Sequence, residues 1–329
     1  MCCCCWELLF KKVENSMTNV ITGIYGSGAS YLAEMLVKQK KPVIGLARWH
    51  SNGHNKNIDS LKNEMDVIEC DLTDLSATVR ALKLAKPTCI YNMASHANVR
   101  ASFDNPISVL DNNIKITINL FEALKILNIS PIIHHVSTSE VYGIVNNSPI
   151  TEEHPLNPAN IYSVSKMTQE KICYAYHNSD HFNIIITRCF SYICPRREDI
   201  FTSAFAKQIV EIEKGKREVL VHGNLNSVRT LMDVRDMSSA YIEATEKCSF
   251  GEPYNIGGSN TLSVGDFLEK LKEKAKVKIK TEIDPKLLRP TDINYQVPDC
   301  TKFKEKTGWK PKISLDESVD FLLEYYRKL

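Results

Sequence analysis

The 329-residue sequence lacks several features by which a protein class is often recognised. No apolar run reaches the length of a membrane span, and the start, MCCCCWELLFKKVENSM, lacks the layout of a signal peptide. Excess charge is also scarce, because 41 basic and 39 acidic residues leave a net charge of +2. Such a balance argues against nucleic acid or a membrane surface as a partner. We therefore expect a cytoplasmic protein that spans no membrane.

The cysteines lack the paired spacing of a disulfide framework or a zinc site. Of the eleven, four stand together at Cys2 to Cys5 and seven are scattered, so we expect reduced thiols and no bound metal. The cluster could be acylated. However, Met17 stands just before the first convincing strand, which favours interpreting residues 1–16 as a dispensable leader or a misplaced start.

What the sequence does contain is a regular alternation of short apolar runs and longer amphipathic segments from Asn19 onward. This alternation is typical of a parallel sheet wound with helices on both faces. After FNIIITRCF the rhythm breaks into loops and isolated helices. We therefore predict an α/β protein, a Rossmann-like doubly wound parallel sheet with a smaller, discontinuous α/β substrate lobe. The expected boundaries are 17–188 plus 232–257 for the cofactor-binding domain and 189–231 plus 258–329 for the substrate lobe.

A glycine-rich turn, TGIYGSGAS, follows the first predicted strand and opens the first helix. Gly23 and Gly26 let the backbone turn tightly and approach a pyrophosphate, which the helix N-terminus then faces. Tyr25 and Ser27 lie in the same turn, and Ala29 stands where a third glycine could be. An ordinary glycine turn is the alternative, but the position at the front of a doubly wound pattern favours a dinucleotide site.

The ends of the next strands extend this predicted cofactor site. Arg48 follows the second strand, where an NAD enzyme has a ribose-binding acid. A guanidinium suits a 2′-phosphate and favours NADP, although a solvated arginine would look the same. After the third strand, Asp71 and Leu72 could frame an adenine, or Asp71 could cap a helix. The fourth strand ends in a stretch that can pass close to a cofactor, with Met93, Ala94 and Ser95.

Two further motifs carry candidate acid–base groups. The fifth strand ends STSEVYG, and ligands bind beyond the carboxyl ends of parallel strands, which places Thr138 and Glu140 at the same edge. Tyr162 and Lys166 stand four residues apart at the predicted start of a helix. That spacing puts both on one face, so the ammonium can favour the phenolate. Tyr-x-x-x-Lys also arises by chance, and Glu140 could be a surface or capping carboxylate.

The glycine turn, STSEVYG and Tyr162-x-x-x-Lys166 together resemble the extended short-chain dehydrogenase/reductase superfamily, from about Asn19 to the C-terminus. Within it, GIYGSGASYLAE, IYNMASHANVRASFDNP, STSEVYG and PRRE are similar to the GDP-mannose 4,6-dehydratases. Other stretches, among them GNLNSVRTLMDVRDM, LLRPTD and TGWKPKISLDES, resemble the GDP-4-keto-6-deoxymannose reductases equally. These shared stretches leave the reductase branch open.

The resemblance implies a reaction and a role for each acid–base group. Tyr162 would remove the proton of the sugar 4-hydroxyl during hydride transfer to NADP⁺, while Lys166 lowers the pKa of that tyrosine and holds the nicotinamide ribose. Glu140 would remove the C5 proton and help expel the C6 hydroxyl as water, and Thr138 would hydrogen-bond the C4 oxygen. The stored hydride would then return to C6, so the implied hydro-lyase converts GDP-mannose to GDP-4-keto-6-deoxymannose. A reductase or epimerase needs no base at C5, so Glu140 favours dehydration.

The resemblance also implies binding residues outside the catalytic group. Arg229 and Arg289 match arginines that hold the diphosphate, a task suited to charge-assisted forks, with structural ion pairing as the alternative. In the loop PRRE, Arg197 is implied to reach a cofactor, sometimes that of a neighbouring subunit, although paired arginines are often only solvated. The remaining implied contacts are Ser102 and Ser191 with the substrate and Tyr192 with the cofactor.

Two departures from the dehydratase pattern concern the substrate pocket. The chain reads Ser191, Tyr192 and Ile193 where the dehydratases usually have Asn-His-Glu. It also has Thr230 where the relatives usually carry an acid. We expect these changes to touch the pocket that reads the hexose and the base.

Three other functions compete with dehydration. They are a GDP-4-keto-6-deoxymannose reductase, an NDP-sugar 4-epimerase and a non-catalytic NADP-sensing binding protein. Binding proteins of that last kind tend to lose the tyrosine or the lysine, and this chain has both. We expect a nucleotide-sugar substrate, with GDP-mannose first, no nucleic acid partner, and a homodimer or homotetramer.

Overall fold

The computed structural model describes residues 17–49, 52–145, 149–288 and 293–329. Its centre is a sheet of seven strands, all parallel, in the order β10-β6-β5-β4-β1-β2-β3. The strands are β1 (Asn19–Thr22), β2 (Val43–Ala47), β3 (Asp66–Glu69), β4 (Cys89–Asn92), β5 (Ile132–Thr138), β6 (Asn183–Cys189) and β10 (Pro253–Ile256). The order reverses between β1 and β4, which is the doubly wound topology that the alternation predicted.

Helices cover both faces of this sheet. One face carries α3 (Leu75–Ala85), α5 (Pro106–Leu127) and α6 (Ile161–Asp180), and the other carries α2 (Ser27–Lys38) and α8 (Val234–Lys247). Each face closes over its own apolar cluster, one centred on Leu120 and Phe121 and the other on Leu32 and Leu36. The Rossmann-like fold class predicted from the sequence is therefore confirmed. None of the helices in the described ranges is long and apolar enough to cross a membrane.

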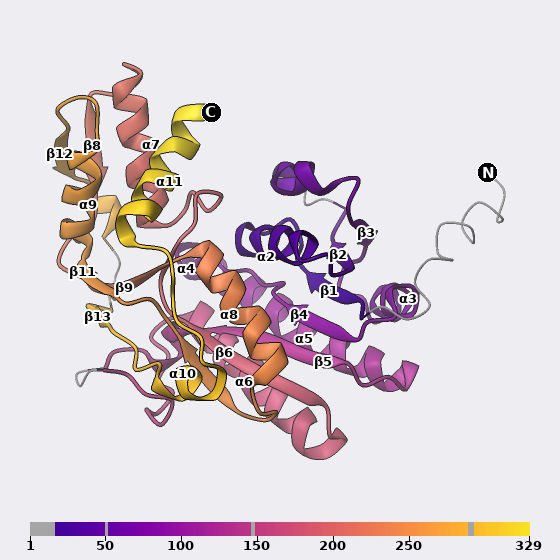
Figure 1. Ribbon diagram of the computed structural model, residues 1–329. Coiled ribbons are helices and arrows are strands. Elements are labelled where there is room, and N and C mark those ends of the chain that lie inside the picture. The colour runs from indigo at the N-terminus through magenta and orange to yellow at the C-terminus, as the bar shows by residue number, and fades with distance from the viewer. Residues whose placement is uncertain (1–16, 50–51, 146–148, 289–292) are drawn as a thin grey trace.

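A second group of strands and helices, with α7 (Phe201–Glu213), α9 (Val264–Glu273) and α11 (Leu315–Lys328), lies beside the sheet at the left of Figure 1. Strand β9 (Val228–Asp233) pairs with β7 (Tyr192–Ile193), β11 (Asn260–Ser263) and β13 (Tyr295–Gln296), and β8 (Val219–His222) pairs with β12 (Lys280–Ile283). The helices α7, α9 and α11 pack together over a third apolar cluster. The remaining short helices are η1 (Asn52–Leu61), α4 (Val99–Asp104), η2 (Ser139–Tyr142), η3 (Pro285–Leu287) and α10 (Thr301–Thr307).

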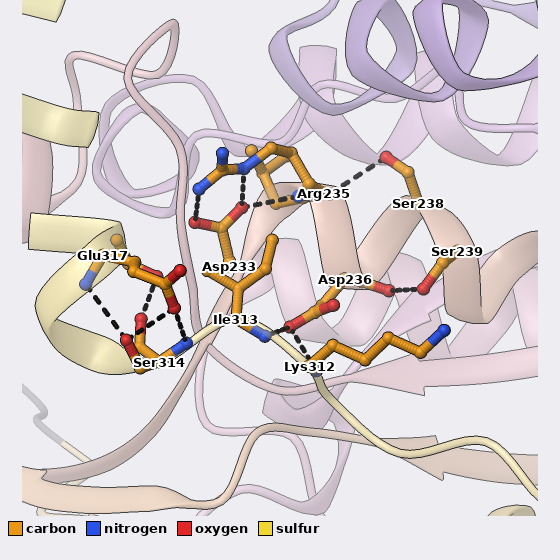
Figure 2. Close-up of polar contacts among 11 residues, drawn as sticks. Asp233, Arg235, Asp236, Ser238, Ser239, Lys312, Ile313, Ser314 and Glu317 are labelled. Carbon is orange, nitrogen blue, oxygen red and sulfur yellow. Dashed lines mark hydrogen bonds and ion pairs between the residues drawn. The ribbon is translucent and has the colours of Figure 1, made fainter. Parts of the chain in front are cut away.

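A carboxylate fastens the C-terminal segment to the start of α8, as Figure 2 shows. Asp236 accepts hydrogen bonds from the backbone N–H groups of Lys312 and Ile313, at 3.0 and 2.9 Å. Directly afterwards, Ser314 caps α11 and Glu317 reaches back to complete a capping box. The chain that returns from α10 is thereby held against α8 just before it forms α11.

A buried ion pair fastens α6 to the sheet. Glu170 of α6 is fully buried, and Arg188 of β6 is only 3% exposed. The guanidinium donates to both carboxylate oxygens, with the shortest N–O distance at 2.8 Å. Ser137 of β5 donates to the same carboxylate, and the hydroxyl of Tyr142 accepts from Arg188 at 2.9 Å. Both charges are thus compensated inside the protein, which is the condition under which charges tolerate burial.

We predict that Glu170→Ala lowers the free energy of unfolding by about 3–5 kcal/mol, because it leaves the Arg188 charge buried without its partner. Urea unfolding followed by circular dichroism measures this loss. The double variant Glu170→Leu with Arg188→Leu is the matched control and should lose less than the single one, since no buried charge remains. If the unfolding free energy of Glu170→Ala lies within about 1 kcal/mol of that of the wild type, the ion pair does not stabilise the fold as predicted.

Candidate functional site

Two adjoining cavities, each of about 350 Å³, open along the carboxyl ends of the sheet strands. The first is lined by residues that follow β1, β2, β3 and β4, and the second lies toward β8, β9 and α7. They share the wall residues Ala97, Thr138, Tyr162, Cys189, Tyr192 and Arg197. The edge predicted from the strand ends is therefore hollow, and Tyr162 stands where the two hollows meet.

Every residue that the sequence predicted for a cofactor lines the first cavity. They are Gly23, Tyr25, Gly26, Ser27, Arg48, Asp71, Leu72, Met93, Ala94, Ser95, Tyr162, Lys166, Tyr192 and Arg197. The side chain of Asp71 accepts from the backbone and hydroxyl of Thr73, whereas the cap of α3 is Asp74. Asp71 therefore does not cap α3, and Asp74 does.

The glycine turn has the geometry that a close backbone approach requires. Gly23 has φ of +68°, and a Cβ added to it would come within 2.9 Å of the Ala94 Cα. Its N–H donates to the Leu46 carbonyl at 2.9 Å, which holds the turn against β2. The turn runs into the N-terminus of α2, whose first N–H groups suit an anion. Arg48 is exposed at the rim of the same cavity, so a phosphorylated dinucleotide fits the residues present.

The loop after β4 is fixed from two sides. The Thr22 hydroxyl accepts from the N–H groups of Met93 and Ala94, both at 2.9 Å. On the other side, the buried amide of Asn113 accepts from the N–H of His96 at 2.8 Å and donates to the Ser165 hydroxyl of α6 at 2.9 Å. The floor of the first cavity and the helix that carries Tyr162 therefore form one hydrogen-bonded unit.

Tyr162 and Lys166 lie on the first turns of α6, as the spacing predicted, and both are buried at the cavity wall. Burial raises the pKa of Tyr162, and the Arg197 guanidinium is the largest influence in the opposite direction, followed by smaller effects that include a hydrogen bond with Thr138. The helical spacing had indicated Lys166 as the source of that positive charge. Burial lowers the pKa of Lys166 itself to about 8.

Glu140 lies in η2, directly after β5, and lines the second cavity together with Thr138 and Tyr162. One of its carboxylate oxygens accepts a hydrogen bond from the Asn160 amide at 2.8 Å. The Thr138 hydroxyl accepts from the backbone N–H of Glu140 at 3.3 Å and begins the η2 turn. A carboxylate, a hydroxyl and a phenol thus face one hollow that is large enough for a sugar.

Arg197 spans the boundary between the cavities. Its guanidinium donates to the Ala97 carbonyl at 3.1 Å and to the Asp199 carboxylate at 3.2 Å. Its neighbour Arg196 points elsewhere, since it pairs with Glu34 of α2 and lies over the Tyr31 ring at 4.1 Å. The two arginines of the PRRE loop therefore separate into one that faces the site and one that fastens the loop.

The residues predicted for the substrate divide into three groups. Ser191 and Arg229 line the second cavity. Ser102 lines neither cavity, because it is fully buried in α4 and its hydroxyl donates to the Val99 carbonyl at 2.7 Å. Arg289 lies outside the described residues. The structure therefore brings two of the four predicted substrate contacts to the cavity and gives Ser102 a structural bond instead.

Two of the positions that depart from the dehydratase pattern line neither cavity. Thr230 is buried on β9, and its hydroxyl bonds that of Thr261 on β11 at 2.7 Å. Ile193 is buried in the third apolar cluster. The expectation that these two positions touch the substrate pocket was wrong, because both side chains serve packing between strands. Ser191 and Tyr192 remain as the departures that line the second cavity.

Eight polar side chains that line the second cavity were not predicted from the sequence. They are Asn98, Arg100, Asp199, Gln208, His222, Asn224, Ser227 and Gln296. These residues come from loops, from short strands and from the helices α4 and α7, and no local spacing in the sequence connects these segments. In the described ranges there is also no group of histidine, cysteine and acidic side chains that could hold a metal ion.

Comparison with known proteins agrees with this geometry. Residues 20–321 match the model of the family described as GDP-mannose 4,6 dehydratase. The chain belongs to this family. The GDP-mannose 4,6 dehydratase of Homo sapiens is 30% identical over 335 residues, which cover 91% of this chain and 88% of that protein. The GDP-6-deoxy-D-mannose reductase of Pseudomonas aeruginosa is 29% identical over 241 residues, covering 72% of this chain and 79% of the relative.

Solved structures share the fold of this family member. The structure of RMD from Pseudomonas aeruginosa complexed with NADPH superposes with a TM-score of 0.82 at 24% identity, covering 95% of this chain and 98% of that one. The UDP-glucuronic acid 4-epimerase of Bacillus cereus, in complex with UDP-glucuronic acid and NAD, gives a TM-score of 0.84 at 25% identity, with 95% and 99% covered. The superfamily resemblance read from the sequence is confirmed.

We predict that the burial of Lys166 makes folding stability depend on pH. Its pKa lies at about 8 in the folded protein, below the ordinary value of 10.5. Between these values the unfolded chain holds a proton that the folded chain has released, so stability should rise with pH. Relative to Lys166→Met, the wild type should gain up to about 3 kcal/mol of unfolding free energy across this interval.

Urea unfolding of both cofactor-free proteins at a series of pH values measures the difference. Lys171→Met, on the exposed face of the same helix, is the matched control. The difference in unfolding free energy between wild type and Lys171→Met should not change with pH. A difference between wild type and Lys166→Met that stays constant with pH would contradict the prediction.

Proposed function

We propose that the protein is an NADP-dependent GDP-mannose 4,6-dehydratase, a hydro-lyase that forms GDP-4-keto-6-deoxymannose. The observation that carries this proposal is that Tyr162 and Glu140 line one cavity, while Lys166 lies in the adjoining one. A sugar between the two bases can lose a proton from its 4-hydroxyl to one and from C5 to the other. Membership of the dehydratase family supports the same reaction.

In the first half of the proposed reaction, the Tyr162 phenolate removes the proton of the sugar 4-hydroxyl. The chemistry that NADP supplies when bound is the reversible storage of a hydride. Arg197 is placed to favour the phenolate, because its charge acts on Tyr162 against the effect of burial. Thr138 lines both cavities beside the phenol and can donate to the C4 oxygen. Lys166 is proposed to hold the cofactor ribose.

In the second half, Glu140 removes the C5 proton, which the C4 ketone has made acidic. The C6 hydroxyl then leaves as water, so that one proton from C5 and one hydroxyl from C6 account for the water lost. Return of the stored hydride to C6 and of a proton to C5 would then complete the 4-keto-6-deoxy sugar, with no net oxidation or reduction. Arg229 and Ser191 line the same cavity and are proposed to bind the substrate. A positively charged fork such as Arg229 suits the diphosphate.

The proposal of NADP rests on Arg48, which stands after β2 at the rim of the first cavity. Solved structures with this fold contain NADPH in one case and NAD in another, so the side chain after β2 has to decide. The division into a cofactor domain (17–188 plus 232–257) and a substrate lobe (189–231 plus 258–329), the cytoplasmic location and the homodimer or homotetramer remain predictions from the sequence.

The second candidate is a GDP-4-keto-6-deoxymannose reductase. The similarity to a GDP-6-deoxy-D-mannose reductase over 72% of this chain favours it. A reductase would use Tyr162 and Lys166 in the same positions but would not require a base at C5. The carboxylate of Glu140 therefore separates the two functions, and it is the residue to test.

We predict that Glu140→Gln still permits hydride transfer from C4 but blocks elimination, because Tyr162 and Lys166 remain and the C5 base does not. With GDP-mannose, the absorbance of reduced cofactor should rise on the enzyme, and little 4-keto-6-deoxy product should form. NMR in deuterated solvent should show slowed exchange at C5. Tyr162→Phe should instead lose at least about a hundredfold in turnover with no reduced cofactor.

Glu153→Gln changes an exposed carboxylate in the segment between η2 and α6, so it is the control and should behave as wild type. A wild-type enzyme that consumes NADPH stoichiometrically with a 4-keto sugar, and a Glu140→Gln variant that loses little activity, would assign the protein to the reductase branch.

We predict that Arg48→Asp shifts the cofactor preference from NADP toward NAD. The carboxylate should repel the 2′-phosphate and accept hydrogen bonds from an unphosphorylated ribose. Dissociation constants for both cofactors, measured by calorimetry at one ionic strength, give the ratio. Arg80→Asp makes the same charge change on the exposed surface of α3 and should leave that ratio unaltered. Equal affinities for the two cofactors in both proteins would refute the role of Arg48.

A further inference from the structure

Asn160 stands immediately before the helix that carries Tyr162, and both ends of its side chain are engaged. Its amide oxygen accepts from the Ser163 N–H at 2.9 Å, and its amide nitrogen donates to the Glu140 carboxylate at 2.8 Å. We propose that Asn160 is a positioning residue that holds Glu140 for removal of the C5 proton while it caps α6. The inference rests on the proposed dehydratase function.

The chemistry of the two partners fixes the orientation of this amide. A backbone N–H can only donate, so the Asn160 oxygen must face Ser163, and an ionised carboxylate can only accept, so the nitrogen must face Glu140. The Ser163 hydroxyl also accepts from the Asn160 N–H at 3.2 Å, which completes a capping box. The side chain therefore bridges the two segments in one orientation.

The backbone beside this bridge is held just as closely. Gly143 ends η2 with φ of +67°, and a Cβ added there would lie 1.8 Å from the Asn157 carbonyl oxygen. Only glycine permits this approach of the turn after β5 to the segment that enters α6. Below it, Tyr142 and Leu156 pack in one apolar cluster. The separation between Glu140 and Asn160 is thus set by packing before the hydrogen bond forms.

The residue type at position 160 matters beyond capping. Serine and aspartate cap helices about as well as asparagine. Serine is too short to reach Glu140, and aspartate would present a second carboxylate that repels it. Asparagine offers an acceptor for the helix and a donor for the carboxylate at once. A cap that served the helix alone would not need the donor.

The hydrogen bond from Asn160 affects catalysis through the orientation of the Glu140 carboxylate. Asn160 donates to Oε2 of Glu140 and so restrains the orientation of the whole carboxylate. Tyr162 follows Asn160 by two residues, so one helix start sets the positions of both bases. Asn160 lines neither cavity and touches no reacting atom. Misplacement of a base by about 1 Å can cost a hundredfold in rate, so such a restraint has a measurable effect.

The test is Asn160→Ser, which keeps a capping side chain and removes the donor. Thermal unfolding should stay close to that of wild type. With GDP-mannose, hydride transfer from C4 should keep its rate, whereas exchange at C5 and product formation should slow by about ten- to a hundredfold. Reduced cofactor should therefore accumulate during turnover. In a Glu140→Gln background, Asn160→Ser should not lower the rate of C5 exchange further, because both substitutions act on removal of the C5 proton.

Ser163→Ala is the matched control, because it weakens the capping box and leaves the bond between Asn160 and Glu140 in place. It should lower the unfolding temperature without changing the ratio of the two half-reaction rates. Asn160→Asp, a second capping variant, should slow elimination at least as much as Asn160→Ser and secures the test if the serine variant does not fold.

The possible failures can be told apart. If wild type dehydrates GDP-mannose and Asn160→Ser keeps the full rate of C5 exchange, the inference is wrong and the proposed function stands. If Asn160→Ser slows both half-reactions equally and lowers stability as Ser163→Ala does, Asn160 is only a cap, and the inference is again overturned. If wild type forms no 4-keto-6-deoxy product, the proposed function and the inference fall together.

Discussion

The buried ion pair between Glu170 and Arg188 is the constraint on which the candidate site depends. Two buried charges are tolerated only while they pair with each other. A shift of α6 along the sheet would separate Glu170 from Arg188, so the ion pair fixes the position of this helix. Lys166 and Tyr162 precede Glu170 by four and eight residues and share its helical face. Their positions at the cavity wall are therefore fixed by a contact that takes no part in the chemistry.

The cofactor side of the site could be predicted from the sequence because it is made of local signals. The glycine turn, the residues after each strand and the Tyr-Lys spacing each occupy a few consecutive residues, and the parallel sheet brings their ends to one edge. All fourteen residues predicted for the cofactor line one cavity for this reason. The sheet itself followed from the alternation of apolar runs and amphipathic segments.

The substrate side could not be predicted to the same depth, because its geometry is made of long-range contacts. Gln208, His222 and Gln296 reach the second cavity from three different elements. Ser102 looked like a pocket residue in a matching stretch but turns its hydroxyl to its own helix. The charge that acts most on Tyr162 is that of Arg197, 35 positions later in the chain, and helical spacing could only indicate Lys166.

The positions at which this chain departs from the dehydratase pattern also divide into packing residues and cavity residues. Thr230 and Ile193 lie in packing between strands, which leaves Ser191 and Tyr192 as the changes at the cavity. Tyr192 lines both cavities, and its hydroxyl would lie 3.4 Å from a Cβ on Gly28. It shares both cavities with Tyr162 and Thr138, whereas Arg229 lines only the second. We propose that these two substitutions bear on which sugar is accepted, because both residues line the second cavity together with Tyr162 and Glu140.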